Sequence, residues 1–290
     1  MSETWTIGRL LQWTTEFLQQ RGSDTPRLDA EVLLAKVKGC PRIALYTAFG
    51  DVAEDALRNE FRELVKQRAA GKPVAYLVGQ REFYSLPFRV TPDVLIPRPE
   101  TEFVLIGLLD QLKSTPTPEG GWHIADVCTG SGILAVCLAR YLPEAKIVAT
   151  DISPAALAIA RENAERHGVA ERIKFVEGDL LSAAPQGTFH AIVSNPPYVT
   201  TAEMAELPPD VRDYEPRIAL EAGPRGTEVI ERLIPQAAER LEAGGALLVE
   251  VSPMIEPRVR ELLAAESRLE VQSTLKDLAG HPRVVRARKK

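Results

Sequence analysis

Residues 195–198, with the sequence Asn-Pro-Pro-Tyr, have the side chains best suited to chemistry in this chain. They follow the apolar run 189–193, which predicts a buried strand. Two consecutive prolines cannot extend a sheet because neither has a backbone N–H, so the strand should end at Asn195 in a stiff corner. The corner offers the Asn195 side chain and the Pro196 carbonyl as acceptors, and the ring of Tyr198. This set suits a planar amide or amino group, although an ordinary strand-ending turn can have the same sequence.

A second candidate site is the glycine-rich segment 126–132, Asp-Val-Cys-Thr-Gly-Ser-Gly, which follows a predicted strand and precedes an apolar helix. Glycines let a ligand approach the backbone, and the start of the helix offers free N–H groups. With Ala135 in third place the pattern also passes as a loose dinucleotide fingerprint. Asp126 points elsewhere, because its carboxylate would repel a pyrophosphate but can accept a hydrogen bond from a cationic amino-acid group.

Two further acids end the next two predicted strands. Asp151 stands where an acid commonly binds both hydroxyls of a ribose. Asp179 precedes Leu180, so a carboxylate and an apolar wall are available to an adenine ring. Acids at three successive strand ends suit a cationic nucleoside, which indicates S-adenosylmethionine. The alternative interpretation is that these are polar strand ends facing water.

The segments that must position these residues alternate between strand and helix in the second half of the chain. This alternation predicts a doubly wound α/β sheet. Strands are expected at 123–128, 146–150, 173–177, 191–194, 246–251, 269–274 and 283–287, and helices at 133–141, 154–167, 227–241 and 256–265.

The first part of the sequence predicts three regions in order. Residues 1–72 have helical periodicity and should form a small helical domain in which the Trp and Phe residues belong to the core. Residues 73–98, punctuated by Pro and Gly, predict an extended β-hairpin connector. Residues 99–290 should form the α/β domain.

Composition limits the class of protein. The net charge of −5 argues against nucleic-acid binding by bulk electrostatics. The three cysteines are far apart and lack metal-ligand spacing, so we expect reduced thiols in a cytoplasmic protein and no metal. Glu3 and Arg9 interrupt the N-terminal segment, and neither a signal peptide nor a membrane span is expected.

Several motifs together resemble known enzymes. Segments 126–132, 151–154, 178–179 and 195–198 are similar to the motifs of class I methyltransferases that act on planar nitrogens. Segments 95–102 (Leu-Ile-Pro-Arg-Pro-Glu-Thr-Glu) and 213–220 (Asp-Tyr-Glu-Pro-Arg-Ile-Ala-Leu) resemble the peptide chain release factor glutamine methyltransferases, the PrmC/HemK family. The resemblance covers nearly the whole chain.

The resemblance implies a Rossmann-like class I methyltransferase domain, joined by the hairpin to a helical domain that docks the substrate. It implies S-adenosyl-L-methionine as cofactor, and methylation of the glutamine side-chain amide nitrogen in the Gly-Gly-Gln motif of class 1 release factors. It further implies a cytoplasmic monomer without direct nucleic-acid binding. The expected cofactor-binding residues are Asp126, Cys128, Thr129, Gly130, Ser131, Gly132, Asp151, Asp179, Leu180 and Asn195. The expected substrate-binding residues are Asn195, Pro196, Pro197 and Tyr198, of which Asn195, Pro196 and Tyr198 are expected to be catalytic.

Two other functions remain open on the sequence alone. An amino-methyltransferase acting on adenine or cytosine of nucleic acid could use the same Asn-Pro-Pro-Tyr corner on a flipped base. The acidic net charge argues against it, and the basic run 283–290 is most simply a last strand with a solvated tail. A cofactor-binding scaffold without activity is the second alternative. One departure from the family pattern is at 251–255, a segment that we expect to lie away from the matched sites.

Overall fold

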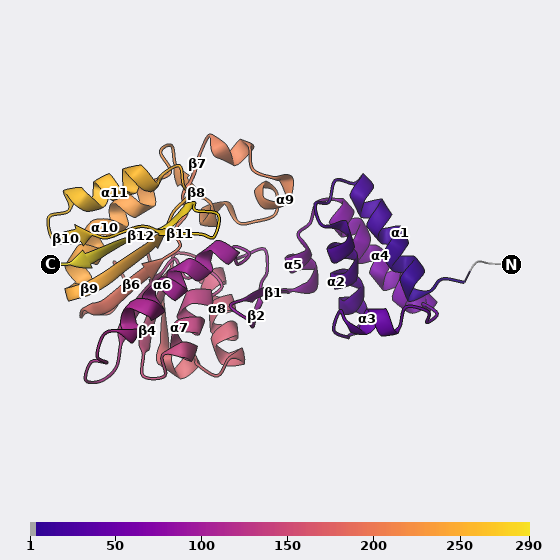
Figure 1. Ribbon diagram of the computed structural model, residues 1–290, viewed down its shortest axis with the longest axis horizontal. Helices are drawn as coiled ribbons and strands as arrows, with labels where there is room; N and C mark the ends of the chain where they lie inside the picture. Colours follow the sequence, from indigo (N-terminus) through magenta and orange to yellow (C-terminus); the bar gives the residue numbers. More distant parts are fainter. Residues whose placement is uncertain (1–3) are drawn as a thin grey trace. The chain divides into compact units, whose positions relative to one another are not determined.

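The computed structural model describes residues 4–290 (Figure 1), so that Glu3 lies outside the described part. The chain forms two compact units. One contains the chain up to Gln80 together with Pro208–Tyr214, and the other contains Arg81–Leu207 and Glu215–Lys290. Within residues 4–290 the helices are too short or too polar to cross a bilayer.

The first unit is helical, as predicted. Its helices are α1 (Ile7–Gln20), α2 (Pro26–Lys38), α3 (Ala44–Thr47), α4 (Asp55–Ala69), α5 (Val74–Val78) and α9 (Pro209–Arg212). Phe61 is buried and Phe17 packs against the core, but Trp13, stacked on Phe17, is 49% exposed. The prediction that the Trp and Phe residues of this unit belong to its core is therefore wrong for Trp13 and also for Phe49, which is 46% exposed.

The segment before the hairpin differs from the sequence prediction. Residues 74–78 form helix α5 instead of extended chain. Pro73 precedes its first residue, Gly79 ends it in the left-handed conformation, and Ala75 and Tyr76 are buried. Packing against α2 and α4 outweighs the weak helix propensity of the two valines. The hairpin itself is present but shorter than expected, with strands β1 (Gln80–Phe83) and β2 (Leu86–Arg89).

The second unit contains the predicted sheet, in the order β10-β12-β9-β6-β3-β4-β5, with β11 paired to β12. Five strands are parallel; β12 pairs antiparallel with β9 at the edge, and β10 pairs antiparallel with β12. The strands are β3 (His123–Val127), β4 (Lys146–Asp151), β5 (Ile173–Glu177), β6 (Phe189–Ser194), β9 (Leu241–Glu250), β10 (Leu269–Val271), β11 (Leu275–Lys276) and β12 (Pro282–Lys289). All seven predicted strands are present; β9 begins five residues earlier than expected, and the strand expected at 269–274 ends at Val271.

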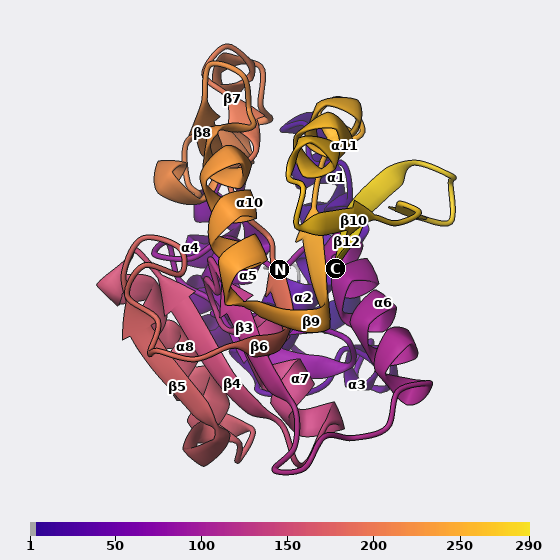
Figure 2. The ribbon, with the colours of Figure 1, turned by 90° about the vertical axis from the view of Figure 1, so that its left-hand side faces the viewer.

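Helices cover both faces of this sheet (Figure 2). Helices α6 (Glu102–Lys113), α7 (Ile133–Tyr141) and α8 (Pro154–Arg166) cover one face, and α10 (Glu228–Arg240) and α11 (Glu256–Ala265) cover the other. Side chains of each parallel strand alternate between the two cores: on β6, Val193 belongs to the first and Ile192 to the second. A smaller parallel pair, β7 (Val199–Thr200) and β8 (Glu221–Gly223), and short 3₁₀ turns at Pro99–Thr101, Ala170–Arg172, Glu203–Ala205 and Arg217–Ala219 complete the unit.

The strand order determines where a ligand should bind. The chain runs from β3 to β4 and β5 on one side and then returns to β6 on the other side of β3. In open parallel sheets ligands bind beyond the carboxyl ends of the strands at this reversal of order. The predicted acids and the Asn-Pro-Pro-Tyr corner follow these ends.

Candidate active site

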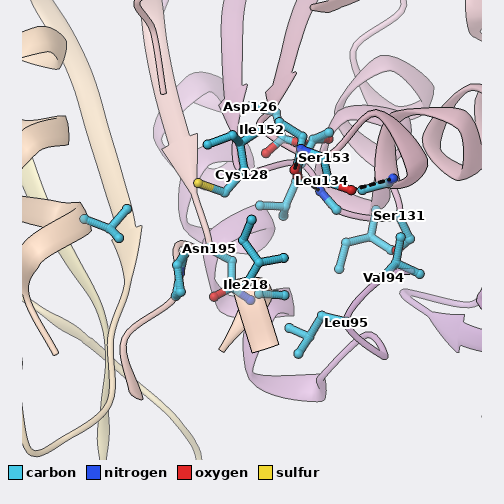
Figure 3. Close-up of a pocket in the computed structure, with 18 of the residues that line it drawn as sticks. Val94, Leu95, Asp126, Cys128, Ser131, Leu134, Ile152, Ser153, Asn195 and Ile218 are labelled. Atoms are coloured by element: carbon cyan, nitrogen blue, oxygen red, sulfur yellow. Dashed lines mark hydrogen bonds between the residues drawn. The ribbon is translucent and has the colours of Figure 1, made fainter. Parts of the chain in front are cut away.

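A cavity of about 300 Å³ opens at the carboxyl ends of β3, β4, β5 and β6 (Figure 3). Its volume is at the lower end of the range for small-molecule sites. Of the residues predicted from the sequence, it is lined by Asp126, Cys128, Thr129, Gly130, Ser131, Asp151, Asp179, Leu180, Asn195 and Pro197. Three predicted residues, Gly132, Pro196 and Tyr198, lie next to these but do not line the cavity.

Asp126, at the end of β3, holds the glycine-rich loop in place. Its Oδ2 accepts hydrogen bonds from the Thr129 hydroxyl (2.6 Å) and from the backbone N–H of Ala135 (3.0 Å) in the first turn of α7. Cys128, between Asp126 and Thr129, adopts a left-handed conformation with φ 61°, which is unusual for a residue with a Cβ. Burial raises the pKa of Asp126 to about 7. The carboxyl group therefore organises the loop as well as facing the ligand space.

Asp151, at the end of β4, is fixed by two backbone donors. Oδ2 accepts from the N–H of Gly130 at 2.8 Å and Oδ1 accepts from the N–H of Ser153 at 2.9 Å. Each carboxylate oxygen has further acceptor capacity, so both remain able to accept from a ligand. Ser153 in turn caps α8, accepting from the N–H of Ala156. Asp151 lines the cavity, and its contact with a ribose stays a prediction.

Gly132 supports the loop by allowing close packing. Its φ of +81° is in the left-handed region, and a Cβ here would lie 3.0 Å from the Cβ of Ala160 on α8. A side chain at position 132 would push the loop away from α8. Gly132 thus allows the loop to pack closely against α8, which helps to set the shape of the cavity.

Asp179, after β5, is less available to a ligand than its sequence position suggests. Its Oδ2 is ion-paired with the guanidinium of Arg232 on α10, and its side chain is 46% exposed. Leu180 beside it is buried and left-handed, with φ 55°. Arg232 also lines the cavity. A ligand amino group that contacts Asp179 would therefore do so beside a cation, which the sequence reasoning missed.

The Asn-Pro-Pro-Tyr corner leaves β6 as predicted. The Nδ2 of Asn195 donates to the hydroxyl oxygen of Thr101 at 3.0 Å, which leaves the Oδ1 of Asn195 as the free acceptor. Pro196 is buried. The hydroxyl of Tyr198 lies 3.4 Å from Oε1 of Glu250, at the end of β9. Burial raises the pKa of Tyr198, so its hydroxyl stays protonated.

The segments 95–102 and 213–220, which the resemblance singled out, form one wall of the cavity. Leu95, Pro97 and Ile218 line it. Glu215 is buried, and its carboxylate accepts from the N–H of Ile96 (3.1 Å) and from the guanidinium of Arg98 (2.5 Å). This acid joins the two segments to each other. The sequence motifs identified both segments, but only the structure shows that Glu215 joins them.

The expectation that segment 251–255 lies away from the matched sites is wrong. Val251 and Ile255 are buried in the cluster against which Tyr198 packs. The reason is the strand order: β9 pairs with β6 in parallel, with Val249 opposite Ser194, so the residues after both strands are neighbours. Glu250 was not among the residues predicted for the site. The sequence signal that could have identified it is an acid directly after the apolar run Leu247-Leu248-Val249.

The charges around the cavity suit a ligand that is positive overall. Asp126, Asp151 and Asp179 contribute carboxyl groups, while Arg98 is ion-paired with Glu215 and Arg232 with Asp179. Within residues 4–290 the acidic, His and Cys side chains form no group suited to a metal ion. A cationic nucleoside such as S-adenosylmethionine is consistent with this set of residues.

Two known families match parts of the chain. Residues 9–79 match the PrmC N-terminal domain, and residues 107–207 match the methyltransferase small domain. Curated relatives match over nearly the full length. The release factor glutamine methyltransferase of Rhodopirellula baltica is 46% identical over 98% of this chain and 97% of its own. That of Moorella thermoacetica is 41% identical over 96% of each chain.

Solved structures share the fold of the second unit. A methyltransferase from Pyrococcus furiosus, 19% identical, covers 79% of this chain and 97% of its own with a TM-score of 0.50. The 16S rRNA N2 G1207 methyltransferase of Thermus thermophilus, solved with AdoMet and guanosine, is 19% identical. It covers 73% of this chain and 50% of its own with a TM-score of 0.51. At this level of identity the likeness establishes the class I methyltransferase fold.

Proposed function

The chain belongs to the family of release factor glutamine methyltransferases, and from this premise we propose the reaction, the residues that perform it and their roles. It transfers a methyl group from S-adenosyl-L-methionine to the side-chain amide nitrogen of the glutamine in the Gly-Gly-Gln motif of class 1 peptide chain release factors. The observation that carries this proposal is the Asn195 amide, held at the carboxyl end of β6 with Oδ1 as the free acceptor at the cavity.

The cofactor supplies an electrophilic methyl group on a sulfonium. Asp151 would bind the ribose hydroxyls, and Asp126 with the loop from Cys128 to Gly132 would hold the amino-acid part. Asp179 and Leu180 would contact the adenine. The fit of this set rests on the carboxylates at the ends of β3, β4 and β5 and on the cavity that they share.

An amide nitrogen is a poor nucleophile because its lone pair is delocalised into the carbonyl. A base would find no usefully acidic proton before the transfer, so the residues must act by position. The Oδ1 of Asn195 and the carbonyl of Pro196 accept the two N–H bonds of the glutamine amide, and Tyr198 packs on its plane. These acceptors hold the nitrogen in line with the methyl group and favour the positive charge that develops on it. One of the two amide protons is then released to water.

We further propose that residues 1–72 dock the release factor, that residues 73–98 connect the domains and that residues 99–290 perform the transfer. The enzyme acts as a monomer in the cytoplasm and does not bind nucleic acid directly.

The proposal is tested by incubating the protein and cofactor with an intact class 1 release factor and sequencing its Gly-Gly-Gln peptide by mass spectrometry. We expect one added methyl group on the glutamine, and none on a release factor whose motif glutamine is replaced by alanine. Duplex DNA and single-stranded RNA serve as competing acceptors. Methylation of a nucleic acid, with the release factor left unmodified, would refute the assignment in favour of the base-modifying alternative.

A further inference from the structure

Two buried polar side chains lie next to the Asn-Pro-Pro-Tyr corner, and the reaction as described does not use them. Thr101, at the start of α6, is fully buried, and Glu250, at the end of β9, is 1% exposed. They come from segments far apart in the sequence, yet both contact the corner: Thr101 through Asn195 and Glu250 through Tyr198.

The buried carboxyl group of Glu250 is only partly used by its neighbours. Oε1 accepts from the Tyr198 hydroxyl at 3.4 Å, a long hydrogen bond, and the Thr101 hydroxyl faces the same carboxyl group. Oε2 has no hydrogen-bond partner within residues 4–290. Burying a carboxyl group with so few donors costs stability, so the presence of an acid here needs a physical reason.

The direction of the hydrogen bonds supplies that reason. An ionised carboxylate can only accept, so a hydroxyl that faces it must donate to it. When Thr101 donates to Glu250, its oxygen can only accept from Asn195. The side chain of Asn195 must then present Nδ2 to Thr101, as observed at 3.0 Å, and turn Oδ1 toward the cavity.

We propose that Glu250 and Thr101 are positioning residues that lock the Asn195 side chain with its oxygen toward the substrate amide. This proposal rests on the proposed function. Without the lock, the Thr101 hydroxyl is free to donate to Asn195, and the amide can turn over and present an N–H to the substrate. An N–H there would oppose the two N–H groups of the glutamine and would fail to favour the charge that develops on its nitrogen.

The surroundings of Glu250 make the lock sensitive to pH. Burial, with Glu100 nearby, raises the pKa of Glu250 to about 7, while Thr101, Tyr198 and Arg283 on β12 oppose the shift. Below this pH the carboxyl group carries a proton that it can donate to Thr101, and the direction of the chain is no longer fixed.

The test compares substitutions at both positions in the full-length enzyme, assayed on intact release factor. Glu250→Leu removes the acceptor and Thr101→Val removes the hydroxyl with little change in volume. We expect kcat to fall about tenfold or more for each, while the KM for release factor changes little. The Kd for S-adenosylhomocysteine, measured by calorimetry, should stay close to the wild-type value. Thr101→Ser, which keeps the hydroxyl, should retain most of the activity.

Two further variants separate positioning from a general effect on folding. Thr227→Val removes another buried hydroxyl of the same unit, at the start of α10, and should leave kcat unchanged. Glu250→Gln keeps an acceptor oxygen but cannot ionise, so its kcat should lose the decline that wild type shows as pH falls through about 7. Comparison with wild type removes the contribution of Asp126, whose pKa is also about 7.

Wild-type kcat in Thr101→Val and Glu250→Leu would overturn the proposal, and so would an equal loss in Thr101→Ser and Thr101→Val. Loss of S-adenosylhomocysteine binding in both variants would likewise overturn it, because the residues would then support the cofactor site. If wild type itself does not methylate the release factor, the proposed function fails first.

Discussion

Replacing Glu250 by glutamine should stabilise the methyltransferase unit at neutral and alkaline pH, even though it alters the pH dependence of catalysis. The carboxyl group is buried, and its pKa in the folded protein is raised from 4.5 to about 7. The folded state therefore holds this proton more tightly than the unfolded state does. Glutamine has nearly the same shape and never ionises, so the substitution removes only the cost of charging the buried group.

The sign and size follow from proton linkage. Stability from the bound proton is complete below the unfolded pKa of 4.5 and is lost as pH rises to about 7, the folded pKa. A pKa difference of about 2.5 units corresponds to about 3 kcal/mol. We therefore expect the free energy of unfolding of the variant, relative to wild type, to increase by about 3 kcal/mol across this window and to be constant above it.

The assay needs a signal from one unit only, and the tryptophans provide it. The chain has three, of which Trp5 and Trp13 belong to the helical unit and Trp122 is 6% exposed beside β3. In a Trp5→Phe, Trp13→Phe background, fluorescence during urea unfolding reports on the sheet unit around Trp122. Glu250→Gln and its parent are compared in this background from about pH 5 to about pH 8. Asp126 titrates in both proteins and cancels. A stability difference that does not change with pH would refute the raised pKa of Glu250 and the reasoning built on it.

Three further substitutions test the rest of the site. Asn195→Ala should lower kcat about 10²-fold or more while the cofactor Kd changes little, because it removes one positioned acceptor; near-normal turnover would exclude Asn195 from the mechanism. Asp151→Ala should weaken cofactor binding at least about tenfold by calorimetry, since the acid fixes the loop and a charged hydrogen bond contributes about 1.5–3 kcal/mol; an unchanged Kd would exclude the ribose contact. Glu215→Gln should speed hydrogen exchange of the Ile96 amide and destabilise the unit by about 1–3 kcal/mol, because Arg98 loses its charged partner; unchanged exchange would show that the two loops are held by other contacts.

Much of the second unit could be predicted because buried parallel strands read as apolar runs and the helices between them have clear starts and ends. Ser153 before Pro154 is such a start, and in the structure Ser153 caps α8. Local signals failed where packing decides. Residues 74–78 have the composition of a strand, yet their contacts with α2 and α4 favour a helix. The prediction for Trp13 was wrong because helical periodicity shows which side chains share a face of the helix. It does not show how much of that face is buried by the rest of the unit.

The candidate site divides in a similar way. Asp126, Asp151 and Asn195 were each predicted at the end of a strand, and they line one cavity because the carboxyl ends of parallel strands lie at one edge of a sheet. Arg232 could not be assigned, because nothing local in α10 indicates which face of the helix turns toward Asp179. The same holds for Glu215, whose partners are more than a hundred residues away. Contacts of this kind are set by the order of the strands, which propensity and spacing do not specify.

Strand order also explains why an acid at position 250 is informative. Once β9 is placed beside β6 in parallel, with Val249 opposite Ser194, the next residue of each strand must be adjacent, and these are Glu250 and Asn195. An ionised Glu250 costs the fold about 3 kcal/mol at neutral pH, which glutamine or leucine would avoid. A buried acid is therefore an expensive way to complete a strand, and packing alone gives no reason for it. A reason exists only if a pure acceptor is needed at that place, and the side chain that benefits from it, through Thr101, is the amide of Asn195.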